Sequence, residues 1–314
     1  MLVTGASGYL ASRLVPALAA GCRDVRLMSR RKPSYPSASR YFAGSPDRDL
    51  AVLREAACDA ATIFHLAGQT SVAQARRDPA ADVQANIMGM VRLLEVAAGA
   101  SRPPTIVFSG TVTEAGIPDG DTLDERVPDR PITEYDIHKL AAEKHLAAAA
   151  MRGVVRGVTL RLANVYGPGT RSLASDRGVL NEMIRRAGTG DRITVFGVGN
   201  QLRDFTFIDD IVRAFLLAAE RAAAVSGRFF VVGSGQRRTF ADIVASIARQ
   251  AAARHGRPVE VDRVDPPLDQ EPIDMRSYVV NASAFMNATG WAPTVSLEDG
   301  IERTLDWLAE GARA

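Results

Sequence analysis

Short apolar runs alternate with helical patterns through the first half of the chain, and this alternation constrains the fold more than any other feature. Patterns typical of strands lie at 1–5, 24–30, 39–44, 61–68, 103–111 and 157–169, and patterns typical of helices at 9–21, 82–100 and 135–151. Strands that alternate with helices predict βαβ units, in which helices cover both faces of a parallel sheet. The sequence therefore predicts an α/β fold with a doubly wound parallel sheet.

The pattern changes after about residue 165, where glycine, proline and arginine become frequent. Short apolar elements such as 192–197 and 228–234 are separated there by helices. We expect residues 1–164 to form one domain, with segments near 203–235 returning to it. Residues 165–314 should form mainly a smaller C-terminal α/β lobe.

Composition argues against several classes of function. A formal net charge of +2 does not favour a broad nucleic-acid-binding face. Two cysteines, Cys22 and Cys58, cannot form a disulfide scaffold, and the four histidines show no metal-ligand spacing. No apolar run reaches transmembrane length and no signal peptide precedes the first strand, so we expect a cytoplasmic protein with no metal and no membrane contact.

A glycine-rich turn joins the first predicted strand to the first predicted helix. It places Gly5, Gly8 and Ala11 in a G-x-x-G-x-x-A spacing. Gly5 permits the tight turn, Gly8 lets the backbone approach a pyrophosphate at the helix N-terminus, and Ala11 allows close packing. The turn indicates a dinucleotide site; the alternative is a turn that binds no ligand. The same turn contributes three further residues to this predicted site, Ser7, Tyr9 and Leu10.

The second predicted strand ends in Ser29, followed by Arg30 and Arg31. A carboxylate at this place accepts hydrogen bonds from the adenosine ribose hydroxyls and repels a 2′-phosphate. Serine removes that repulsion, and two guanidinium groups can bind a phosphate. The sequence thus predicts NADP(H) as the cofactor. The alternative is a solvated loop in an arginine-rich chain.

Tyr135 and Lys139 are four residues apart and share one face of a predicted helix. A tyrosine hydroxyl with a pKa of about 10 is a poor acid–base group at neutral pH. A neighbouring ammonium group stabilises the phenolate and lowers that pKa. Tyr135 can then protonate a carbonyl oxygen during reduction, with Lys139 holding the cofactor ribose. One of only three lysines in the chain occupies this position.

With these motifs the chain resembles the extended short-chain dehydrogenase/reductase family, also called the NAD-dependent epimerase/dehydratase family of nucleotide-sugar enzymes. The resemblance covers essentially the whole chain. It rests on "TGASGYLA", "FHLAG", "QANIMGMVRLLEVA", "IVFSGT", "YDIHK", "RLANVYGPG", "RDFTFIDDI", "RSYVVNASA" and "TGWAPTVSLEDGIERTLDWL". It implies a dinucleotide-binding Rossmann domain over 1–164 and a lobe within 165–314 that mainly binds a nucleotide sugar.

The resemblance also implies roles for single residues. Thr111 matches the catalytic hydroxyl that binds the substrate carbonyl beside Tyr135, with Ser109 as the fallback and as a cofactor contact. Asn164 matches a residue near the substrate diphosphate, and Arg203 and Arg276 match arginines that clamp it. The alternative for each arginine is a surface salt bridge. Further cofactor contacts are implied at Leu66, Ala67, Gly68 and Asn86, and a further substrate contact at Gln69.

Three reactions share this framework. A 4,6-dehydratase places Asp-Glu after the catalytic threonine, where this chain has Val112 and Thr113, so dehydration is disfavoured. A 4-epimerase usually retains NAD and has an acidic residue after the second strand. NADPH instead suits a one-way reduction. The resemblance is greatest to dTDP-4-keto-6-deoxyhexose 4-ketoreductases of antibiotic deoxysugar pathways, in which hydride from NADPH reaches C4 of the sugar.

Other readings stay open. A reductase of a non-sugar ketone or aldehyde would have no use for Arg203 and Arg276. A family member without catalysis, acting as an NADP-binding regulator, would not need Thr111, Tyr135 and Lys139 together. Residues 135–150 have an alanine-rich face that fits either internal packing or a helix pair in a homodimer.

Overall fold

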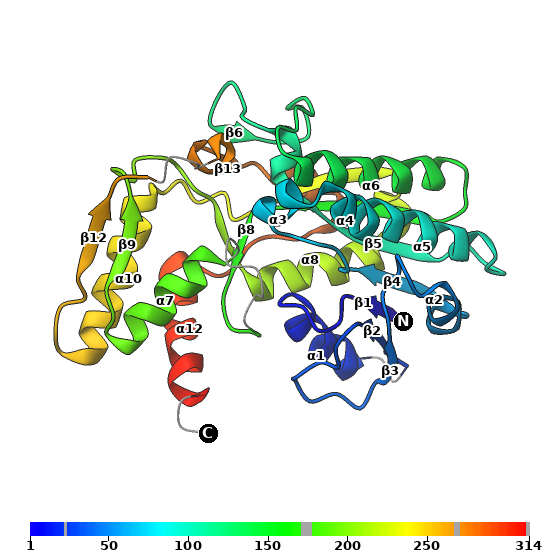
Figure 1. Ribbon diagram of the computed structural model, residues 1–314, viewed down its shortest axis with the longest axis horizontal. Coiled ribbons are helices and arrows are strands. Elements are labelled where there is room, and N and C mark those ends of the chain that lie inside the picture. The colour runs from blue at the N-terminus through cyan, green and yellow to red at the C-terminus, as the bar shows by residue number, and fades with distance from the viewer. Residues whose placement is uncertain (22–23, 171–177, 267–270, 312–314) are drawn as a thin grey trace.

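A sheet of parallel strands forms the centre of the computed structural model (Figure 1). The structure describes residues 1–21, 24–170, 178–266 and 271–311, so Cys22 lies outside the described residues. The strands of this sheet are β1 (Leu2–Thr4), β2 (Arg26–Ser29), β3 (Arg40–Ala43), β4 (Thr62–His65), β5 (Thr105–Thr111), β7 (Arg156–Leu162) and β11 (Arg228–Val232). Within the described ranges these seven pair in parallel in the order β11-β7-β5-β4-β1-β2-β3. The predicted doubly wound parallel sheet is confirmed.

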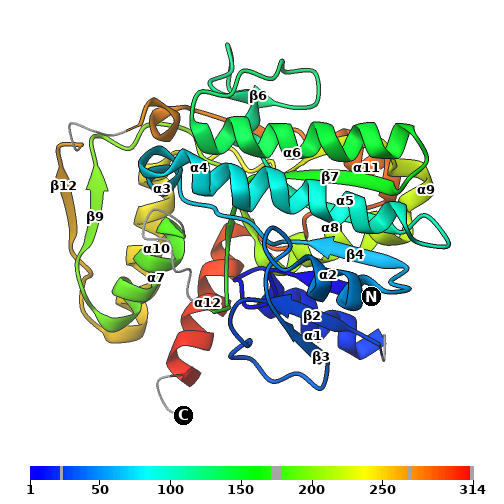
Figure 2. The same cartoon turned by 45° about the vertical axis from the view of Figure 1, so that its right-hand side comes forward.

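Helices cover both faces of this sheet (Figures 1 and 2). One face packs against α1 (Ala11–Gly21), α8 (Ile208–Glu220), α9 (Ala222–Val225) and α11 (Ser283–Thr289). The other packs against α2 (Leu50–Ala57), α5 (Gly89–Ala98) and α6 (Glu134–Met151), and the last two lie side by side. Two short helices, α3 (Val72–Arg77) and α4 (Pro79–Asp82), precede α5.

The two covered faces explain why the strands lack an apolar–polar alternation. Val3 and Phe64 belong to the core on the α8 side, whereas their neighbours Leu2 and Ile63 belong to the core on the α5–α6 side. Successive side chains of a strand point to opposite faces, so a strand buried on both faces needs a continuous apolar run.

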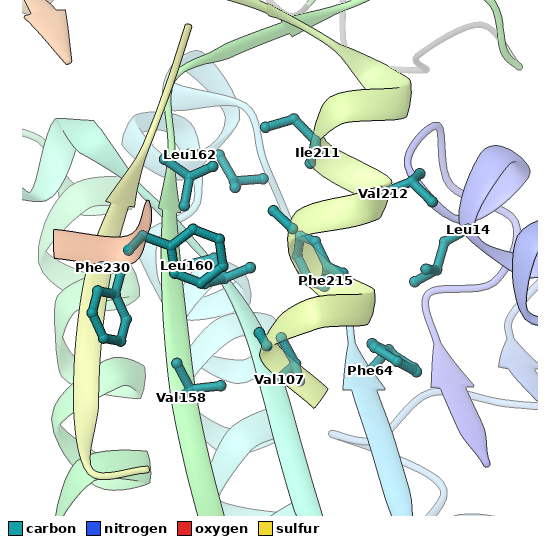
Figure 3. Packing of buried hydrophobic residues seen from close by; sticks show 14 of the residues in the cluster. Leu14, Phe64, Val107, Val158, Leu160, Leu162, Ile211, Val212, Phe215 and Phe230 are labelled. Carbon is teal, nitrogen blue, oxygen red and sulfur yellow. The ribbon is translucent and has the colours of Figure 1, made fainter. Parts of the chain in front are cut away.

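Helix α8 packs along the strands of the sheet and lies at the centre of one core (Figure 3). Ile211 points from α8 toward Leu162, and Phe215 points toward Leu160 of the same strand. The ring centroids of Phe215 and Phe64 are 6.4 Å apart. Burial of one such side chain stabilises the fold by about 1.5–3 kcal/mol. The segment near 203–235 thus returns to the main sheet through α8 and β11.

The C-terminal lobe has a core of its own. It contains α7 (Val179–Thr189), α10 (Phe240–His255), α12 (Leu297–Gly311) and the parallel pair β9 (Ile193–Phe196) and β12 (Val261–Val264). This lobe lies to one side of the main sheet, far from β3 (Figure 1). The remaining short elements are β6 (Thr122–Leu123), β8 (Asn164–Tyr166), β10 (Phe205–Phe207), β13 (Val279–Val280) and two 3₁₀ turns, Val112–Ala115 and Pro272–Met275.

The helix predicted over 82–100 differs from the structure in its first turns. Residues Val83–Met88 form a π-helix, which continues into α5 at Gly89. Such wide turns are rare and often stand at functional sites. Asn86, one of the predicted cofactor residues, lies in this segment.

Asp204 connects three parts of the chain that are distant in sequence. Its fully buried carboxylate precedes β10 and accepts hydrogen bonds from the backbone N–H groups of Ser234 (2.8 Å), Gly235 (2.9 Å) and Val280 (3.0 Å). The Ser234 hydroxyl donates a further bond of 2.8 Å. These contacts fix the junction between the main sheet and the C-terminal lobe.

Replacing Asp204 with alanine should lower the free energy of unfolding by about 2–4 kcal/mol, because three buried N–H donors lose their acceptor. Urea unfolding at neutral pH measures the change. Asp306→Asn is the control, since its ion pair with Arg254 is exposed and should be worth less than about 1 kcal/mol. Equal stability of the two variants would contradict this role of Asp204.

Candidate active site

The strand order of the sheet reverses at β1, which separates the β2–β3 half of the sheet from the half that begins with β4. In open parallel sheets the ligand crevice is expected outside the carboxyl ends of the strands at such a switch point. Gly5 follows β1 with a φ of 69°, and a Cβ there would lie 2.6 Å from the backbone of Leu66 and Ala67 after β4. The turn requires glycine for its left-handed backbone and for this close approach.

The N-terminus of α1 borders this crevice. Ser7 and Gly8 are exposed in the turn, whereas Leu10 packs on the core beneath it. The Tyr9 hydroxyl donates to the Gly167 carbonyl (2.8 Å) and so connects the turn to the loop after β8. The partial positive charge of a helix N-terminus favours a pyrophosphate at this place.

A row of cations follows β2. The Ser29 hydroxyl is buried and donates to the Arg31 carbonyl (2.7 Å), which folds the chain into a turn. The Tyr41 hydroxyl fixes the same turn by donating to the Ser29 carbonyl (2.7 Å). Arg30, Arg31 and Lys32 are exposed, and none has an ion-pair partner among the described residues. The row can therefore bind an anion without first breaking a salt bridge.

The end of β5 carries the predicted catalytic hydroxyl. Thr111 is buried, and its Oγ1 lies 2.9 Å from the Thr113 hydroxyl. Its N–H donates to the Glu114 carboxyl (2.9 Å), so Thr111 caps the 3₁₀ turn that follows. Two residues earlier, the Ser109 carbonyl accepts a hydrogen bond from the Lys139 ammonium (2.6 Å). The fallback Ser109 thus meets Lys139 through its backbone.

Helix α6 places Tyr135 and Lys139 against the end of β5. The Thr133 side chain caps the helix by accepting from the Asp136 N–H (3.2 Å), which sets the start of α6 just before Tyr135. Both predicted catalytic side chains are buried, Tyr135 against Val72 and Ala75. The Lys139 ammonium lies 4.0 Å from the centre of the Phe108 ring. Helix α6 also packs on the 3₁₀ turn after Thr111.

His65 ends β4 beside this group. Burial, and secondarily the nearby Lys139 ammonium, lower the pKa of His65 to about 3, so the imidazole is neutral at physiological pH. Its Nδ1 lies 2.8 Å from the Thr4 hydroxyl, and its ring stacks on Phe108 with centroids 5.6 Å apart. A neutral ring leaves Lys139 as the cation beside the predicted catalytic residues.

A buried polar network lies between β4 and α6. The Asp82 carboxylate accepts from Gln69 (2.7 Å) and Asn86 (3.0 Å), and its second oxygen lies 2.6 Å from His138 Nδ1. The Asn86 side chain crowds Gly68, where a Cβ would lie 2.5 Å from its oxygen. Gln69 was predicted to contact substrate; the structure places its amide nitrogen on chain atoms, including the Ser71 carbonyl (2.7 Å).

Sequence reasoning did not find Asp82 or His138 as site residues. His138 was visible within "YDIHK" between two predicted catalytic residues, but nothing in the sequence pairs it with a residue 56 positions earlier. Tyr35 was also missed; its hydroxyl donates to the Ala6 carbonyl (2.6 Å) and holds the loop after β2 over the glycine-rich turn.

The predicted substrate residues of the C-terminal half come together around Tyr278. The Tyr278 hydroxyl accepts from the Asn164 amide (2.7 Å), and the Arg276 guanidinium lies 4.7 Å from its ring centre. The Arg276 guanidinium donates to the Ile273 carbonyl (3.1 Å), and burial, then this guanidinium, lower the pKa of Arg203. Arg203 donates to the carbonyl of Asp274 rather than to a carboxylate. Two clustered guanidinium groups form a site suited to a diphosphate.

Three features of the described residues fit the binding of a dinucleotide. Gly5 lets the turn after β1 approach the backbone after β4 closely, and three exposed cations follow β2. The buried amide oxygen of Asn86 accepts no hydrogen bond from the described residues. No cluster of three or more metal-ligating side chains occurs in the described part of the chain, and no helix there is long and apolar enough to cross a membrane.

A parallel sheet in this strand order, with a glycine-rich turn after β1, is typical of Rossmann-type α/β proteins. The chain belongs to the NAD dependent epimerase/dehydratase family, whose sequence profile matches residues 1–233. It is therefore an enzyme of a nicotinamide-dependent family that acts on nucleotide sugars.

Named relatives span the whole chain. A UDP-glucose 4-epimerase of Mycolicibacterium smegmatis is 31% identical over 98% of this chain and 97% of its own length. A dTDP-6-deoxy-L-talose 4-dehydrogenase (NAD(P)(+)) of Kitasatospora kifunensis is 28% identical over 98% of this chain and 94% of its own. The crystal structure of Thermus thermophilus UDP-glucose 4-epimerase in complex with NAD is 26% identical, covers 98% of both chains and has a TM-score of 0.85.

Gly5→Ala should weaken dinucleotide binding at least about tenfold, because the new methyl group must push the β1 turn away from the β4 turn. Fluorescence titration with NADPH and NADH measures the affinity. Gly21→Ala is the matched control, since a Cβ there meets no atom within 4 Å. Unchanged affinity in Gly5→Ala would exclude this crevice as the dinucleotide site.

Proposed function

We propose that this protein reduces the C4 ketone of a dTDP-4-keto-6-deoxyhexose with NADPH. The observation that carries the proposal is the cation row after β2. Ser29 stands at the ribose position with its hydroxyl used in its own turn, and Arg30 and Arg31 follow, exposed and without ion-pair partners among the described residues. A 2′-phosphate would meet cations here, and no carboxylate of this strand end would bind the hydroxyls of NAD.

The chain's own residues supply the acid–base chemistry. Bound NADPH would supply the hydride. Thr111 at the end of β5 would hydrogen-bond the carbonyl oxygen, and Tyr135 would give it a proton. Lys139, held by the Ser109 carbonyl at 2.6 Å, would stabilise the resulting phenolate. The neutral state of His65 supports this assignment, since its imidazole adds no positive charge beside Lys139.

We place the sugar nucleotide between the main sheet and the C-terminal lobe. Residues 165–314, which contain this lobe, would supply most of its contacts. Arg203, Arg276 and Asn164 gather around Tyr278, and the two arginines would bind the diphosphate. A simple ketone or aldehyde would leave these cations unused. Dehydration lacks its acid and base, because Val112 is apolar and the Thr113 hydroxyl is hydrogen-bonded to Thr111 (2.9 Å).

A nucleotide-sugar 4-epimerase is the second candidate. Most of the named relatives are 4-epimerases, and the same threonine, tyrosine and lysine would serve an oxidation followed by a re-reduction. The cation row favours the reductase over this candidate. We also propose a homodimer formed through α6, whose outer face exposes Ile137 (49%) and Met151 (80%).

The proposal predicts NADPH oxidation, followed by absorbance, with dTDP-4-keto-6-deoxyglucose. NADPH should be preferred over NADH at least about tenfold, and UDP-glucose and a non-sugar ketone should not support turnover. A Ser29→Asp/Arg30→Ala variant should lose the preference, because the first change adds a carboxylate that repels a 2′-phosphate and the second removes a cation. Arg102→Ala, an exposed arginine at the opposite end of β5, should keep it.

If 4-keto sugars cause no NADPH oxidation and the protein interconverts UDP-glucose and UDP-galactose, the protein is the epimerase instead. Turnover with equal use of NADPH and NADH would sink the cofactor assignment and leave the reductase standing.

A further inference from the structure

We propose that Glu114 is a positioning residue that holds Thr111 in place and whose protonation state makes the reaction pH-dependent. The inference rests on the proposed function, because it takes Thr111, Tyr135 and Lys139 as the catalytic residues. No sequence pattern pointed to Glu114, and the structure shows it as the most deeply buried carboxyl group beside Thr111, with no exposed surface.

Glu114 contacts Thr111 directly. Glu114 Oε1 accepts the backbone N–H of Thr111 at 2.9 Å, and the Thr111 side chain caps the turn in return. This reciprocal arrangement fixes the residue that would bind the substrate carbonyl. Gly110 makes the space, because a Cβ at that position would lie 3.0 Å from Glu114 Oε1 and 2.6 Å from Thr159 Cγ2.

Arg161 connects Glu114 to helix α6. Arg161 Nε lies 3.0 Å from Glu114 Oε2, and its guanidinium donates two hydrogen bonds, of 2.9 and 2.7 Å, to Glu143. Glu143 lies four residues after Lys139 on the buried face of α6. Arg161 of β7 therefore joins the turn that carries Thr111 to the helix that carries Tyr135 and Lys139.

The surroundings of the Glu114 carboxyl group favour its protonated form. Only Oε1 of Glu114 accepts a hydrogen bond among the described residues, since the Arg161 N–H nearest to Oε2 is directed at Glu143. An ionised Glu114 would therefore be stabilised by one hydrogen bond only from the described residues, at Oε1, although its carboxyl group is fully buried. Burial, and then the Glu143 carboxylate, raise the pKa of Glu114 to about 8, against the opposing effects of Arg161, the Thr111 N–H and Lys139.

The surrounding charges give the direction of the pH effect. Glu143 and Asp129 already face Arg161 and Lys144, so two carboxylates balance two cations. Ionisation of Glu114 above about pH 8 adds a third negative charge to this cluster, beside Thr111 and near Lys139. That charge opposes formation of the Tyr135 phenolate and of negative charge on the substrate oxygen. The rate of reduction should therefore fall as pH rises through the pKa of Glu114.

The test compares Glu114→Gln and Glu114→Leu by the pH dependence of kcat for NADPH-dependent reduction. Glutamine keeps the acceptor for Thr111 and cannot ionise. We expect it to stay within about threefold of wild type near pH 6.5 and to exceed wild type about fivefold or more near pH 9. Leucine removes the acceptor and should lower kcat at least about thirtyfold at both pH values, with KM changed little. Glu95→Gln, on the exposed surface of α5, is the control.

A glutamine variant whose pH profile superimposes on that of wild type would overturn the proposal, as would a leucine variant with normal kcat and a normal melting temperature. Infrared difference spectroscopy supplies a readout independent of turnover. Wild type should lose one carboxylic acid C=O band as pH rises past about 8, and the glutamine variant should lack that band. A missing band in wild type would refute the titration.

The Tyr135→Phe variant distinguishes a failure of the proposed function from a failure of the role of Glu114. If Tyr135→Phe retains the activity of wild type, the catalytic assignment is wrong, whatever the infrared band shows. If Tyr135→Phe is inactive and the Glu114 variants behave as wild type, only the role of Glu114 is wrong.

Discussion

Parallel pairing of the central strands is the constraint on which the rest of the structure depends. Because all seven run in one direction, their carboxyl ends lie along one edge of the sheet. Gly5, Ser29, His65 and Thr111 come from four different strand ends and meet along that edge. The chain needs no long-range motif to assemble the site, since topology alone brings these residues together.

Buried charge then fixes the geometry that topology only approximates. Arg161 is almost completely buried and contacts Glu114, Glu143 and Asp129. Asp204 plays the corresponding part at the junction with the C-terminal lobe, where it binds backbone N–H groups of two separate segments. Removal of one partner from such a network leaves an uncompensated polar group in the interior, so these residues hold their elements in one arrangement.

The sequence allowed prediction of the fold and of the residues at the strand ends, because these follow from local patterns. The apolar runs predicted the strands of the main sheet, and Gly5 predicted the tight turn after β1; the dinucleotide site at this turn stays a prediction. The short pairs β6–β13 and β9–β12 were not predicted as pairs, since their partners are distant in sequence. The π-helical turns at Val83–Met88 were missed because their pattern is that of an ordinary helix.

The contacts that orient the site were also beyond sequence reasoning. His138 with Asp82, and Tyr278 with Asn164, meet only in the folded chain. The Gln69 amide donates to a carboxylate thirteen residues away that no motif marks, and its contact with substrate stays a prediction. The cofactor preference inferred from Ser29, Arg30 and Arg31 stays a prediction, as does the role of the arginine pair near Tyr278.

The most direct test of the account follows the hydride itself. The protein is incubated with a dTDP-4-keto-6-deoxyhexose and NADPH in which both hydrogens at C4 of the nicotinamide are deuterium, and the sugar product is examined by mass spectrometry and NMR. The account predicts one deuterium at C4 of the sugar for each NADPH oxidised. A product without deuterium, or epimerised sugar formed without net NADPH oxidation, would contradict it.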